Sequence, residues 1–439
     1  MGFGLIGVFM TFNIITLGCK VNQYESQTMS EMLKKCGYTP SEDKNRADIT
    51  IINTCTVTAV SDAKNRKLIH KTRRNNPDGI IVLTGCMPQA FPERVTDFEG
   101  CDIVLGNKRR SDLIDKLDEF KLTRVKIVDI EAHDNKDAEY ENISVTNFDG
   151  HTRAFVKIED GCNRFCSYCI IPYSRGRVRS KKPEDLKKEI EKIADNGYKE
   201  VVLVGINLSA YGQGEDFDLA DAVDICCDTD GIERVRLGSF EPEMMYDSLI
   251  KRFSKQKKFC PQFHLSLQSG SDSTLKRMRR QYDTAEYMKI VEDLRNSFDN
   301  SSITTDVMVG FAGETDEEFT ESLEFVKKVG FSKTHVFPYS RRMGTLADKM
   351  DNHVDNKIKD KRSKLMLEAA DELRREFLSS QVGRVESVLV ERLRDGGYYE
   401  GYTMNYTPVH ILCDDDLTGK IVDVKLTKAC DDYCEGELV

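Results

Sequence analysis

The chain has 439 residues, which is enough for two or three domains with hydrophobic cores of their own. Charged residues make up 31% of it and the net charge is −10, which fits a soluble protein and excludes a general affinity for nucleic acid. The 14 cysteines occur without a secretory context and indicate reduced thiols or metal ligands, not a disulfide framework.

The first 18 residues are apolar and uncharged, but they lack the basic segment and the cleavage site of a signal peptide. Because residues 13–18 read well as a buried strand, we expect the natural start at Met10, with residues 1–9 an extension. No later run is long or apolar enough to span a membrane. We therefore expect a cytoplasmic protein.

The N-terminal third alternates short apolar runs with helical patterns. The runs are rich in β-branched side chains and are bounded by polar or turn residues, as buried parallel strands are. This alternation predicts a small doubly wound α/β domain over residues 1–145. The expected strands are residues 13–17, 48–53, 79–84 and 102–105, and the expected helices are residues 24–36 and 61–73.

Three of these strands end within two residues of a cysteine: Cys19, Cys55 and Cys86. The carboxyl ends of parallel strands lie at one edge of a sheet, so the topology gathers three thiols that are far apart in sequence. Three converging thiolates would form a metal-cluster site with one coordination position left open. The alternative is that they are ordinary buried cysteines at strand ends.

A second triad lies in one short loop, where Cys162, Cys166 and Cys169 are separated by three and by two residues. An odd number of thiols cannot pair off as disulfides, so a metal centre is favoured. A four-iron cluster normally takes four cysteines, and three leave one iron open to a ligand with an amine and a carboxylate, such as S-adenosylmethionine. The alternatives are a zinc knuckle without its fourth ligand and a chance clustering.

This spacing resembles the signature of the radical S-adenosylmethionine (SAM) enzymes. The longer run Asp160-Gly-Cys-Asn-Arg-Phe-Cys-Ser-Tyr-Cys-Ile-Ile-Pro-Tyr173, followed by Arg175-Gly176, resembles one branch of them, the methylthiotransferases. The resemblance implies that the three cysteines hold a 4Fe-4S cluster that binds SAM, with Tyr168 packed near the adenine.

Three N-terminal segments resemble the first domain of the same family. The resemblance implies a second 4Fe-4S cluster on Cys19, Cys55 and Cys86, with Asn22 and Gln23 beside the cluster or facing the substrate. The three segments are Leu17-Gly-Cys-Lys-Val-Asn-Gln-Tyr-Glu-Ser26, Asn53-Thr-Cys-Thr-Val-Thr58 and Thr84-Gly-Cys-Met-Pro-Gln89.

Residues 146–378 repeat a strand–helix unit. The repeat predicts a central α/β domain, an open (β/α)6 partial barrel (the radical SAM core), with its chemistry at the carboxyl ends of the strands. The expected strands are residues 153–158, 200–204, 234–237, 263–267, 303–309 and 333–337, and helices are expected at residues 183–196 and 357–377.

The ends of these expected strands are rich in glycine and polar residues. Gly205-Ile-Asn207 stands where the superfamily has a Gly-Gly-Glu-like segment that binds the amine of SAM, and Asn207 would replace the ion pair by a hydrogen bond. Taken singly, each glycine turn is more often an ordinary one. The cofactor-binding residues that we expect from the resemblance are Tyr168, Gly205, Asn207, Ser239, Glu241, Gln268, Asp306 and Gly310.

Two groups of cations are candidates for RNA contact. The run after the cluster loop would bind the RNA backbone, unless it pairs with acidic neighbours such as Glu184 and Asp185. The second group lies on one helix face and is more simply a solvated surface. The run comprises Arg175, Arg177, Arg179, Lys181 and Lys182, and the helix face comprises Lys64, Arg66, Lys67, His70, Lys71, Arg73 and Arg74.

Residues 379–439 have the alternating pattern of a small all-β barrel and resemble the TRAM RNA-binding domain. Residues 382–439 contain 6 Lys and Arg against 12 Asp and Glu, so a purely electrostatic grip on RNA is not expected. Contact would rest on three arginines and on aromatic rings. The expected strands are residues 382–390, 397–402, 410–413 and 419–426, and the expected RNA contacts are Arg384, Arg392, Arg394, Tyr402 and Tyr406.

Within the family, Thr16-Leu-Gly-Cys-Lys-Val-Asn-Gln-Tyr-Glu-Ser26 and Gly205-Ile-Asn-Leu-Ser-Ala-Tyr-Gly212 most resemble the MtaB-type branch. That branch adds a methylthio group to carbon 2 of N6-threonylcarbamoyladenosine at position 37 of the tRNA anticodon stem-loop. The resemblance implies that SAM serves as radical source at one cluster and as methyl donor for a sulfur on the other. It also implies a flavodoxin- or ferredoxin-like electron donor and a sulfur donor that the sequence does not identify.

Three other interpretations stay open. One relative methylthiolates N6-isopentenyladenosine in tRNA, and another modifies an aspartate of a ribosomal protein. The segment from Gly205 to Gly212 and the basic run argue mildly against the protein substrate. The third is a non-catalytic iron–sulfur sensor that binds RNA, and the ordered motifs at the strand ends argue against it.

Overall fold

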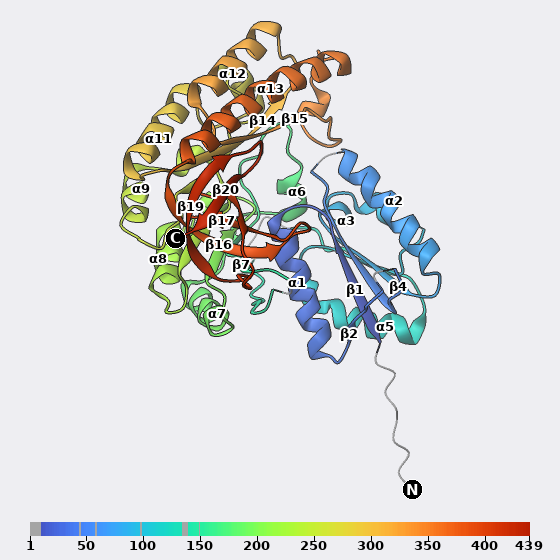
Figure 1. Cartoon of the computed structure of the whole chain (residues 1–439). Helices are drawn as coiled ribbons and strands as arrows, with labels where there is room; N and C mark the ends of the chain where they lie inside the picture. The colour runs from blue at the N-terminus through green and yellow to red at the C-terminus, as the bar shows by residue number, and fades with distance from the viewer. Residues whose placement is uncertain (1–9, 44, 58, 97–98, 134–138, 149) are drawn as a thin grey trace. The chain divides into compact units, whose positions relative to one another are not determined.

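The computed structural model describes residues 10–43, 45–57, 59–96, 99–133, 139–148 and 150–439. The expected start at Met10 concerns residues 1–9, which lie outside the described residues. The chain forms two compact units (Figure 1). The first unit takes in the chain up to Val145 together with Asp160–Arg164 and Cys169–Arg179, and the second takes in Thr146–Glu159, Phe165–Tyr168 and Ser180–Val439.

The first unit is built on a parallel sheet of six strands in the order β2-β1-β3-β4-β5-β6. The four predicted strands correspond to β1, β3, β4 and β5, and the short edge strands β2 and β6 were not predicted. The strands are β1 (Thr11–Thr16), β2 (Thr39–Pro40), β3 (Ile49–Thr54), β4 (Ile80–Gly85), β5 (Ile103–Leu105) and β6 (Ile127–Asp129).

Helices cover both faces of this sheet, so the predicted doubly wound arrangement is confirmed. Alternate strand residues pack in opposite directions: Ile51 and Val82 join Leu33 and Leu117 in one core, whereas Ile52 and Leu83 lie in a second core. The second core is completed by Ile69. The helices are α1 (Lys20–Lys35), α2 (Ala59–Asn75), α3 (Cys86–Ala90), α4 (Pro92–Val95), α5 (Leu113–Thr123) and α6 (Ile171–Arg175).

The second unit contains the predicted open partial barrel, whose strands are all parallel. They form two sheets, β7-β10-β11 and β12-β13-β14-β15, joined where Val235 bridges to Phe259 and accepts a hydrogen bond from the Cys260 amide (2.8 Å). The strands are β7 (Arg153–Lys157), β10 (Glu200–Val204), β11 (Arg234–Leu237), β12 (Ser239–Phe240), β13 (Gln262–Leu265), β14 (Ser302–Val309) and β15 (Lys333–Pro338), with short β8 (Glu159–Asp160) and β9 (Arg179–Ser180) in the chain between β7 and β10.

The helices of the second unit pack outside these strands (Figure 1). The predicted α7 has Leu186, Ile190 and Ile193 fully buried, as its apolar face requires. Among the described helices, none is long and apolar enough to cross a membrane. The helices are α7 (Pro183–Asp195), α8 (Leu219–Asp228), α9 (Asp247–Phe253), α10 (Asp272–Met278), α11 (Thr284–Ser297), α12 (Asp316–Val329) and α13 (Asn356–Gln381).

The chain ends in a closed five-stranded barrel in the order β16-β17-β18-β20-β19, which confirms the predicted all-β module. Its core includes Val388, Val409 and Val424, and Leu378 of α13 packs against them. The last strand was not predicted, because its charged sequence lacks an apolar alternation. The strands are β16 (Val385–Leu393), β17 (Tyr398–Thr403), β18 (Pro408–Leu412), β19 (Ile421–Ala429) and β20 (Cys434–Leu438).

Two buried arginines of β11 attach this C-terminal barrel to the partial barrel. Arg234 donates to the carbonyls of Tyr402 (2.9 Å) and Ser387 (2.6 Å). Arg236 donates to the carbonyl of Met404 (2.9 Å) and pairs with the buried carboxylate of Glu200 (2.9 Å). Glu200 supplies the negative charge that these arginines need. Burial alone would raise the pKa of Glu200, but the neighbouring arginines outweigh burial and lower it, so the group stays a carboxylate.

This interface predicts a large stability difference between two arginines. Arg236→Met should lower the free energy of unfolding by about 3–5 kcal/mol, because the Glu200 carboxylate would stay buried without its closest cation. Arg252→Met is the control, since Arg252 is 40% exposed in its ion pairs with Asp221 and Asp224 and should cost at most about 1 kcal/mol. Urea unfolding of the two variants measures the difference, and equal losses would contradict the role given to Arg236.

Candidate functional site

The sheet of the first unit reverses its direction of winding at β1. From β1 the chain passes to β2 on one side and then to β3 on the other, and the carboxyl ends of strands at such a reversal are where sheets of this kind bind ligands. Cys19 lies at the N-cap of α1 after β1, Cys55 directly follows β3, and Cys86 is the first residue of α3 after β4. The topology therefore brings the three predicted cysteines to one edge.

The three thiols lie close enough to affect one another. A β-carbon on Gly18 would stand 2.8 Å from Cβ and 3.2 Å from Sγ of Cys55, so the absence of a side chain lets the β1–α1 turn approach this cysteine. Burial raises the pKa of the Cys55 thiol to about 11, and the thiols of Cys86 and Cys19 add to the rise. Three neighbouring thiols are the donor set that an iron–sulfur cluster uses, so the residues fit such a group.

The guanidinium of Arg175 lies beside these thiols and is completely buried. Its Nε donates to Cys86 Sγ (3.2 Å), and one terminal nitrogen donates to Asn22 Oδ1 (2.7 Å). Both terminal nitrogens also bind the buried carboxylate of Glu25. Burial tends to lower the pKa of Arg175, but the negative partners Cys86 and Glu25 outweigh it and raise the pKa, so the group stays a cation.

Gly161–Ile170, the segment that carries the second cysteine triad, has no helix or strand. In the first unit, the Cys162 amide donates to the Gly176 carbonyl (3.0 Å). In the second unit, Ser167 is held at both ends, because its amide donates to the Met278 carbonyl (3.0 Å) and its carbonyl accepts from the Ala347 amide (2.7 Å). These bonds are made by backbone groups, so they fix the loop without using a thiol.

Arg280 gives Cys166 a partner like that of Cys86. One terminal nitrogen of Arg280 donates to Cys166 Sγ (3.3 Å), and the other pairs with the Glu241 carboxylate. Burial tends to lower the pKa of Arg280, but Tyr168, Tyr282, Glu241 and Cys166 together raise it. Sequence analysis did not single out Arg280, because nothing in Arg-Met-Arg-Arg distinguishes a thiol-binding cation from a surface one.

The aromatic ring expected near adenine packs on the partial barrel. Tyr168 meets Phe311 edge to face with 6.3 Å between ring centres, and it lies against a core that includes Met308 and Tyr339. This contact orients the ring, while its role toward a cofactor stays a prediction.

The turn after β10 is organised by a carboxylate that sequence analysis missed. Glu159 Oε2 accepts a hydrogen bond from the Asn207 amide (2.7 Å), and a β-carbon on Gly205 would lie only 2.6 Å from that oxygen. Within the described residues, Asn207 Oδ1 is buried without a hydrogen-bond partner. A buried amide oxygen in this state suits the ammonium group expected here.

Most of the remaining expected cofactor residues lie at or just after strand ends, whereas Asp306 lies inside β14. Ser239 is exposed at the start of β12, and the Glu241 amide donates to Ser209 Oγ (2.7 Å). Gln268 has a positive φ (66°), and its backbone joins β14 through the Asp306 carbonyl (2.9 Å). Gly310 also has a positive φ (69°), which any other residue would adopt with strain.

The prediction that the basic run binds RNA is wrong for two of its residues. Arg175 is buried beside the thiols, and Lys181 is buried in an ion pair with Glu189. Arg179 pairs with Asp160 (3.0 Å) and Lys182 with Glu215 (2.8 Å). Most cations of this run therefore pair with acidic residues of the protein, but with Asp160, Glu189 and Glu215 instead of the expected Glu184 and Asp185.

The expected RNA contacts of the C-terminal barrel also have other partners. The rings of Tyr402 and Tyr406 stack on each other at 4.5 Å, and Arg153 lies over both at 5.3 and 5.1 Å. Arg394 pairs with Glu400 (2.5 Å), as Arg392 does (3.2 Å). These groups serve the interface and the fold of the barrel, so they do not form a free stacking surface.

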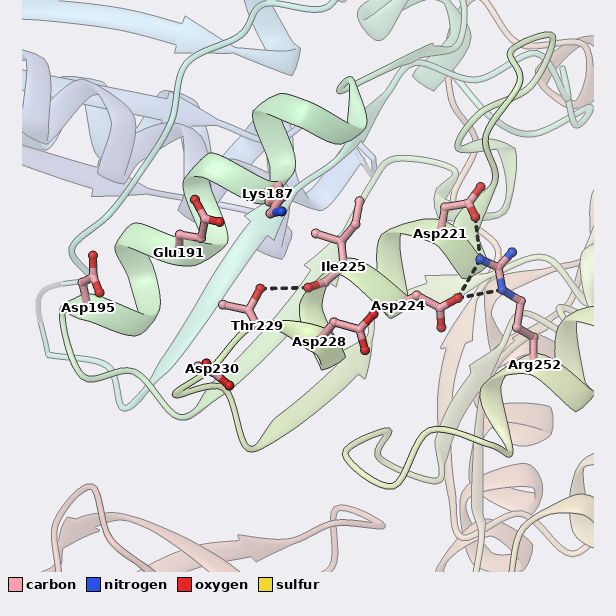
Figure 2. A pocket seen from close by; sticks show the side chains of 10 residues that line it. All are labelled: Lys187, Glu191, Asp195, Asp221, Asp224, Ile225, Asp228, Thr229, Asp230 and Arg252. Carbon is pink, nitrogen blue, oxygen red and sulfur yellow. Dashed lines mark hydrogen bonds and ion pairs between the residues drawn. The ribbon is translucent and has the colours of Figure 1, made fainter.

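A hollow of about 570 Å³ opens among α7, α8 and α9, and its lining differs in composition from the cysteine sites (Figure 2). Carboxylates dominate its lining, and Arg252 reaches Asp221 (2.5 Å) and Asp224 (2.6 Å) on one side. Its negative charge would repel RNA phosphates, and it contains no thiol. The hollow is therefore not the site of the chemistry.

The fold and the cysteine pattern define a class, the radical SAM enzymes. Residues 156–326 match the Radical SAM superfamily, residues 11–106 match the family described as Uncharacterized protein family UPF0004, and residues 379–439 match the TRAM domain. The fold of TsrM from Kitasatospora setae, a radical SAM methyltransferase, is similar over 75% of each chain, with a TM-score of 0.56 at 14% identity.

Relatives narrow the class. The chain is 38% identical over 430 residues to the threonylcarbamoyladenosine tRNA methylthiotransferase MtaB of Bacillus subtilis, covering 97% of this chain and 95% of the relative. It is 36% identical over 428 residues to a tRNA-2-methylthio-N(6)-dimethylallyladenosine synthase of Clostridium botulinum, covering 95% and 94%. The chain belongs to the radical SAM tRNA methylthiotransferases, whose cofactors are 4Fe-4S clusters and SAM.

The geometry at the end of β10 predicts an effect on SAM binding. In Gly205→Ala the new methyl group would displace the Glu159 carboxylate and break its bond to the Asn207 amide. We expect the Kd for SAM to rise about 10- to 100-fold, the range for losing a hydrogen bond to a charged group. Anaerobic calorimetric titration of the iron-reconstituted protein measures this change.

Gly330→Ala is the matched control for Gly205→Ala. It also replaces a glycine, at a positive φ (66°), but no neighbouring atom lies closer than 3.9 Å to the new methyl group and the site is at the end of α12. It should lower stability without changing SAM affinity. An unchanged affinity in Gly205→Ala would contradict the role given to this turn.

Proposed function

We propose that this enzyme methylthiolates carbon 2 of N6-threonylcarbamoyladenosine at position 37 of tRNA, in the cytoplasm, with two 4Fe-4S clusters. The observation that carries the proposal is the gathering of Cys19, Cys55 and Cys86 at the carboxyl edge of the first sheet, beside the cation of Arg175. Forming a radical from SAM needs only the cluster of the SAM-binding loop. A second thiol triad supports a second cluster and, with it, transfer of sulfur.

Each triad would hold one cluster. Cys162, Cys166 and Cys169 would hold the cluster that binds SAM, and Cys19, Cys55 and Cys86 would hold the other. When bound, these groups supply a radical that can remove hydrogen from an aromatic carbon and the sulfur that replaces it. An electron donor of the flavodoxin or ferredoxin class would feed the first cluster.

The protein's own residues position and shield these groups. Tyr168 and the cofactor-binding residues expected at the strand ends, from Gly205 and Asn207 to Gly310, would hold SAM over the partial barrel. The buried cations Arg175 and Arg280 would balance the charge of the thiolates that they contact. In such chemistry the protein positions the cofactors and compensates their charge with fixed groups.

A second candidate is supported by the dimethylallyladenosine-type relatives. They are 36% identical to this chain, against 38% for the Bacillus subtilis MtaB, so overall identity alone does not choose the base. The N-terminal motif through Ser26 and the segment Gly205–Gly212 favour the threonylcarbamoyl substrate. The two candidates share fold, clusters and reaction, and they differ in the group on N6 of the adenosine.

Mass spectrometry of nucleosides from total tRNA, with and without this gene, separates the candidates. Loss of the methylthio form of threonylcarbamoyladenosine, with its parent accumulating, is the expected result. Loss of methylthio-isopentenyladenosine instead would support the methylthiotransferase reaction but show that the substrate is the isopentenyl-modified adenosine. If neither nucleoside changes, the tRNA substrate is refuted and an aspartate of a ribosomal protein is the next one to assay.

An assay of the purified, iron-reconstituted enzyme, with 5′-deoxyadenosine and the methylthio nucleoside as its two readouts, tests the division of labour in two cysteine variants. Cys166→Ala should abolish both 5′-deoxyadenosine and the methylthio product, because the SAM-binding cluster would lose a ligand. Cys55→Ala should keep 5′-deoxyadenosine formation and lose only the product. Cys226→Ala is the control, since this buried cysteine of α8 belongs to neither triad and should leave both readouts near wild type. Normal product from either triad variant would refute the assignment.

The basic face of α2 is the region that supports RNA backbone contact in this acidic protein. The helix contains six Lys and Arg against one Asp, and Lys64, Lys67 and Lys71 form one exposed stripe. The helix begins shortly after Cys55, so the stripe starts near the cysteine edge. Arg73 does not belong to this surface, because it pairs with Asp102 (2.5 Å).

Replacing the stripe tests this interaction. Lys64→Ala, Lys67→Ala and Lys71→Ala together should weaken binding of an anticodon stem-loop and lower the slope of log K against log salt by about one for each phosphate that is no longer neutralised. The control removes three exposed lysines of the second unit, Lys251, Lys255 and Lys257, and should leave the slope unchanged. Equal slopes in the two triple variants would show that α2 does not contact the RNA backbone.

A further inference from the structure

We propose that Arg175 tunes the cluster held by Cys19, Cys55 and Cys86, by donating a hydrogen bond and a positive charge to the Cys86 thiolate. The inference deepens the proposed function and rests on the second cluster that it assigns. Arg175 follows the SAM-cluster cysteines in sequence, yet its side chain serves the other triad. It would act as a positioning residue, because it touches a ligand of the cluster and not the substrate.

The contacts leave the guanidinium no freedom to move. Nε donates to Cys86 Sγ at 3.2 Å, and the terminal nitrogens donate to Glu25 and to Asn22 Oδ1 (2.7 Å). Asn22 is fixed in turn, since its Nδ2 donates to the carbonyls of Leu17 (2.7 Å) and Thr54 (3.1 Å), which precede two of the cysteines. Because the two terminal nitrogens of the planar guanidinium are fixed in this way, its Nε–H points at the sulfur of Cys86.

The partner atoms also exclude a role in binding substrate. Arg175 is completely buried, and Glu25, which is 2% exposed, takes both of its terminal nitrogens. A phosphate of RNA would have to replace the carboxylate in a site that solvent does not reach. The guanidinium is therefore bound entirely by protein groups, and Cys86 is the one of these partners that would be a cluster ligand.

The physical effect on a cluster follows from charge. Reduction adds an electron to a centre that already carries thiolate charge, so a cation and a hydrogen bond at the sulfur favour the reduced form. The same hydrogen bond stabilises the thiolate against protonation and loss of iron. Without Arg175, the reduction potential of this cluster should fall and the iron should leave faster.

The experiment isolates this cluster from the other. In a parent protein with Cys162, Cys166 and Cys169 all changed to Ala, the remaining iron–sulfur signal belongs to the first triad. Potentiometric titration followed by electron paramagnetic resonance gives its midpoint potential, and absorbance during incubation with a chelator gives the rate of cluster loss. In this parent, Arg175→Met should shift the potential to a more negative value and speed cluster loss roughly 10- to 100-fold.

Two further variants separate tuning from structure. Arg110→Met removes another buried arginine that binds the same Glu25 carboxylate (2.8 Å). It contacts Asn107 (3.2 Å) and not a thiol, and Asn107 Nδ2 lies 4.0 Å from Cys86 Sγ, so the potential should shift much less than in Arg175→Met. Arg175→Lys keeps the charge without the fork and should fall between the parent and Arg175→Met. If Arg175→Met does not fold, the comparison of Arg175→Lys with Arg110→Met decides in the same way.

The outcomes distinguish this inference from the proposed function. A parent without any cluster signal would refute the second cluster and, with it, the basis of the proposal. A parent with a cluster whose potential is shifted equally by the Arg175 and Arg110 variants, or by neither, would refute the role of Arg175 alone. A shift that is much larger in Arg175→Met than in Arg110→Met supports it.

Discussion

Each cysteine triad has one thiol that lies against the guanidinium of a buried arginine, and a metal-bound thiolate at that position would need such a compensating charge. Cys86 contacts Arg175 and Cys166 contacts Arg280, at 3.2 and 3.3 Å, and a glutamate holds each arginine in place. The arrangement recurs in two units with different sheets, so it reflects the chemistry of the ligands and not a shared fold. A buried Arg–Glu pair is a costly way to stabilise a protein, and its placement at both cysteine triads is better explained by the charge that a metal-bound thiolate brings.

Parallel strands supply the second constraint, because they bring residues that are distant in sequence to one edge. In the first unit, the reversal of winding at β1 places the ends of β1, β3 and β4 side by side, so that cysteines separated by whole helices meet. The other triad needs no such topology, since its members lie in one loop that is anchored through Ser167. The partial barrel then adds its own strand ends, where Asn207, Glu241 and Gln268 lie.

The sequence predicted the parts whose signal is local. Runs of β-branched residues located β3, β4 and β14 to within one residue at each end, because most positions of these strands are buried. β2 and β6 are too short for such a signal, and β20 contains two glutamates among its five residues. Arg175 was assigned to RNA because a cation after a cluster loop looks like a phosphate ligand, and its true partner Glu25 lies 150 positions earlier. Only the fold brings those two residues together.

The sequence predicted that the C-terminal barrel contacts RNA, but its charged and aromatic groups mainly attach the barrel to the rest of the second unit. Tyr402 and Tyr406 stack against Arg153, and the carbonyls around them accept from Arg234 and Arg236, so this end of the barrel is used for attachment. The barrel's arginines at positions 392 and 394 share Glu400, which reduces what they can offer to phosphates. The lysines of α2 have no such commitment to a buried carboxylate and face the solvent. An acidic enzyme that acts on RNA must draw on its exposed cations, and in this chain α2 presents a continuous stripe of them next to a cysteine triad.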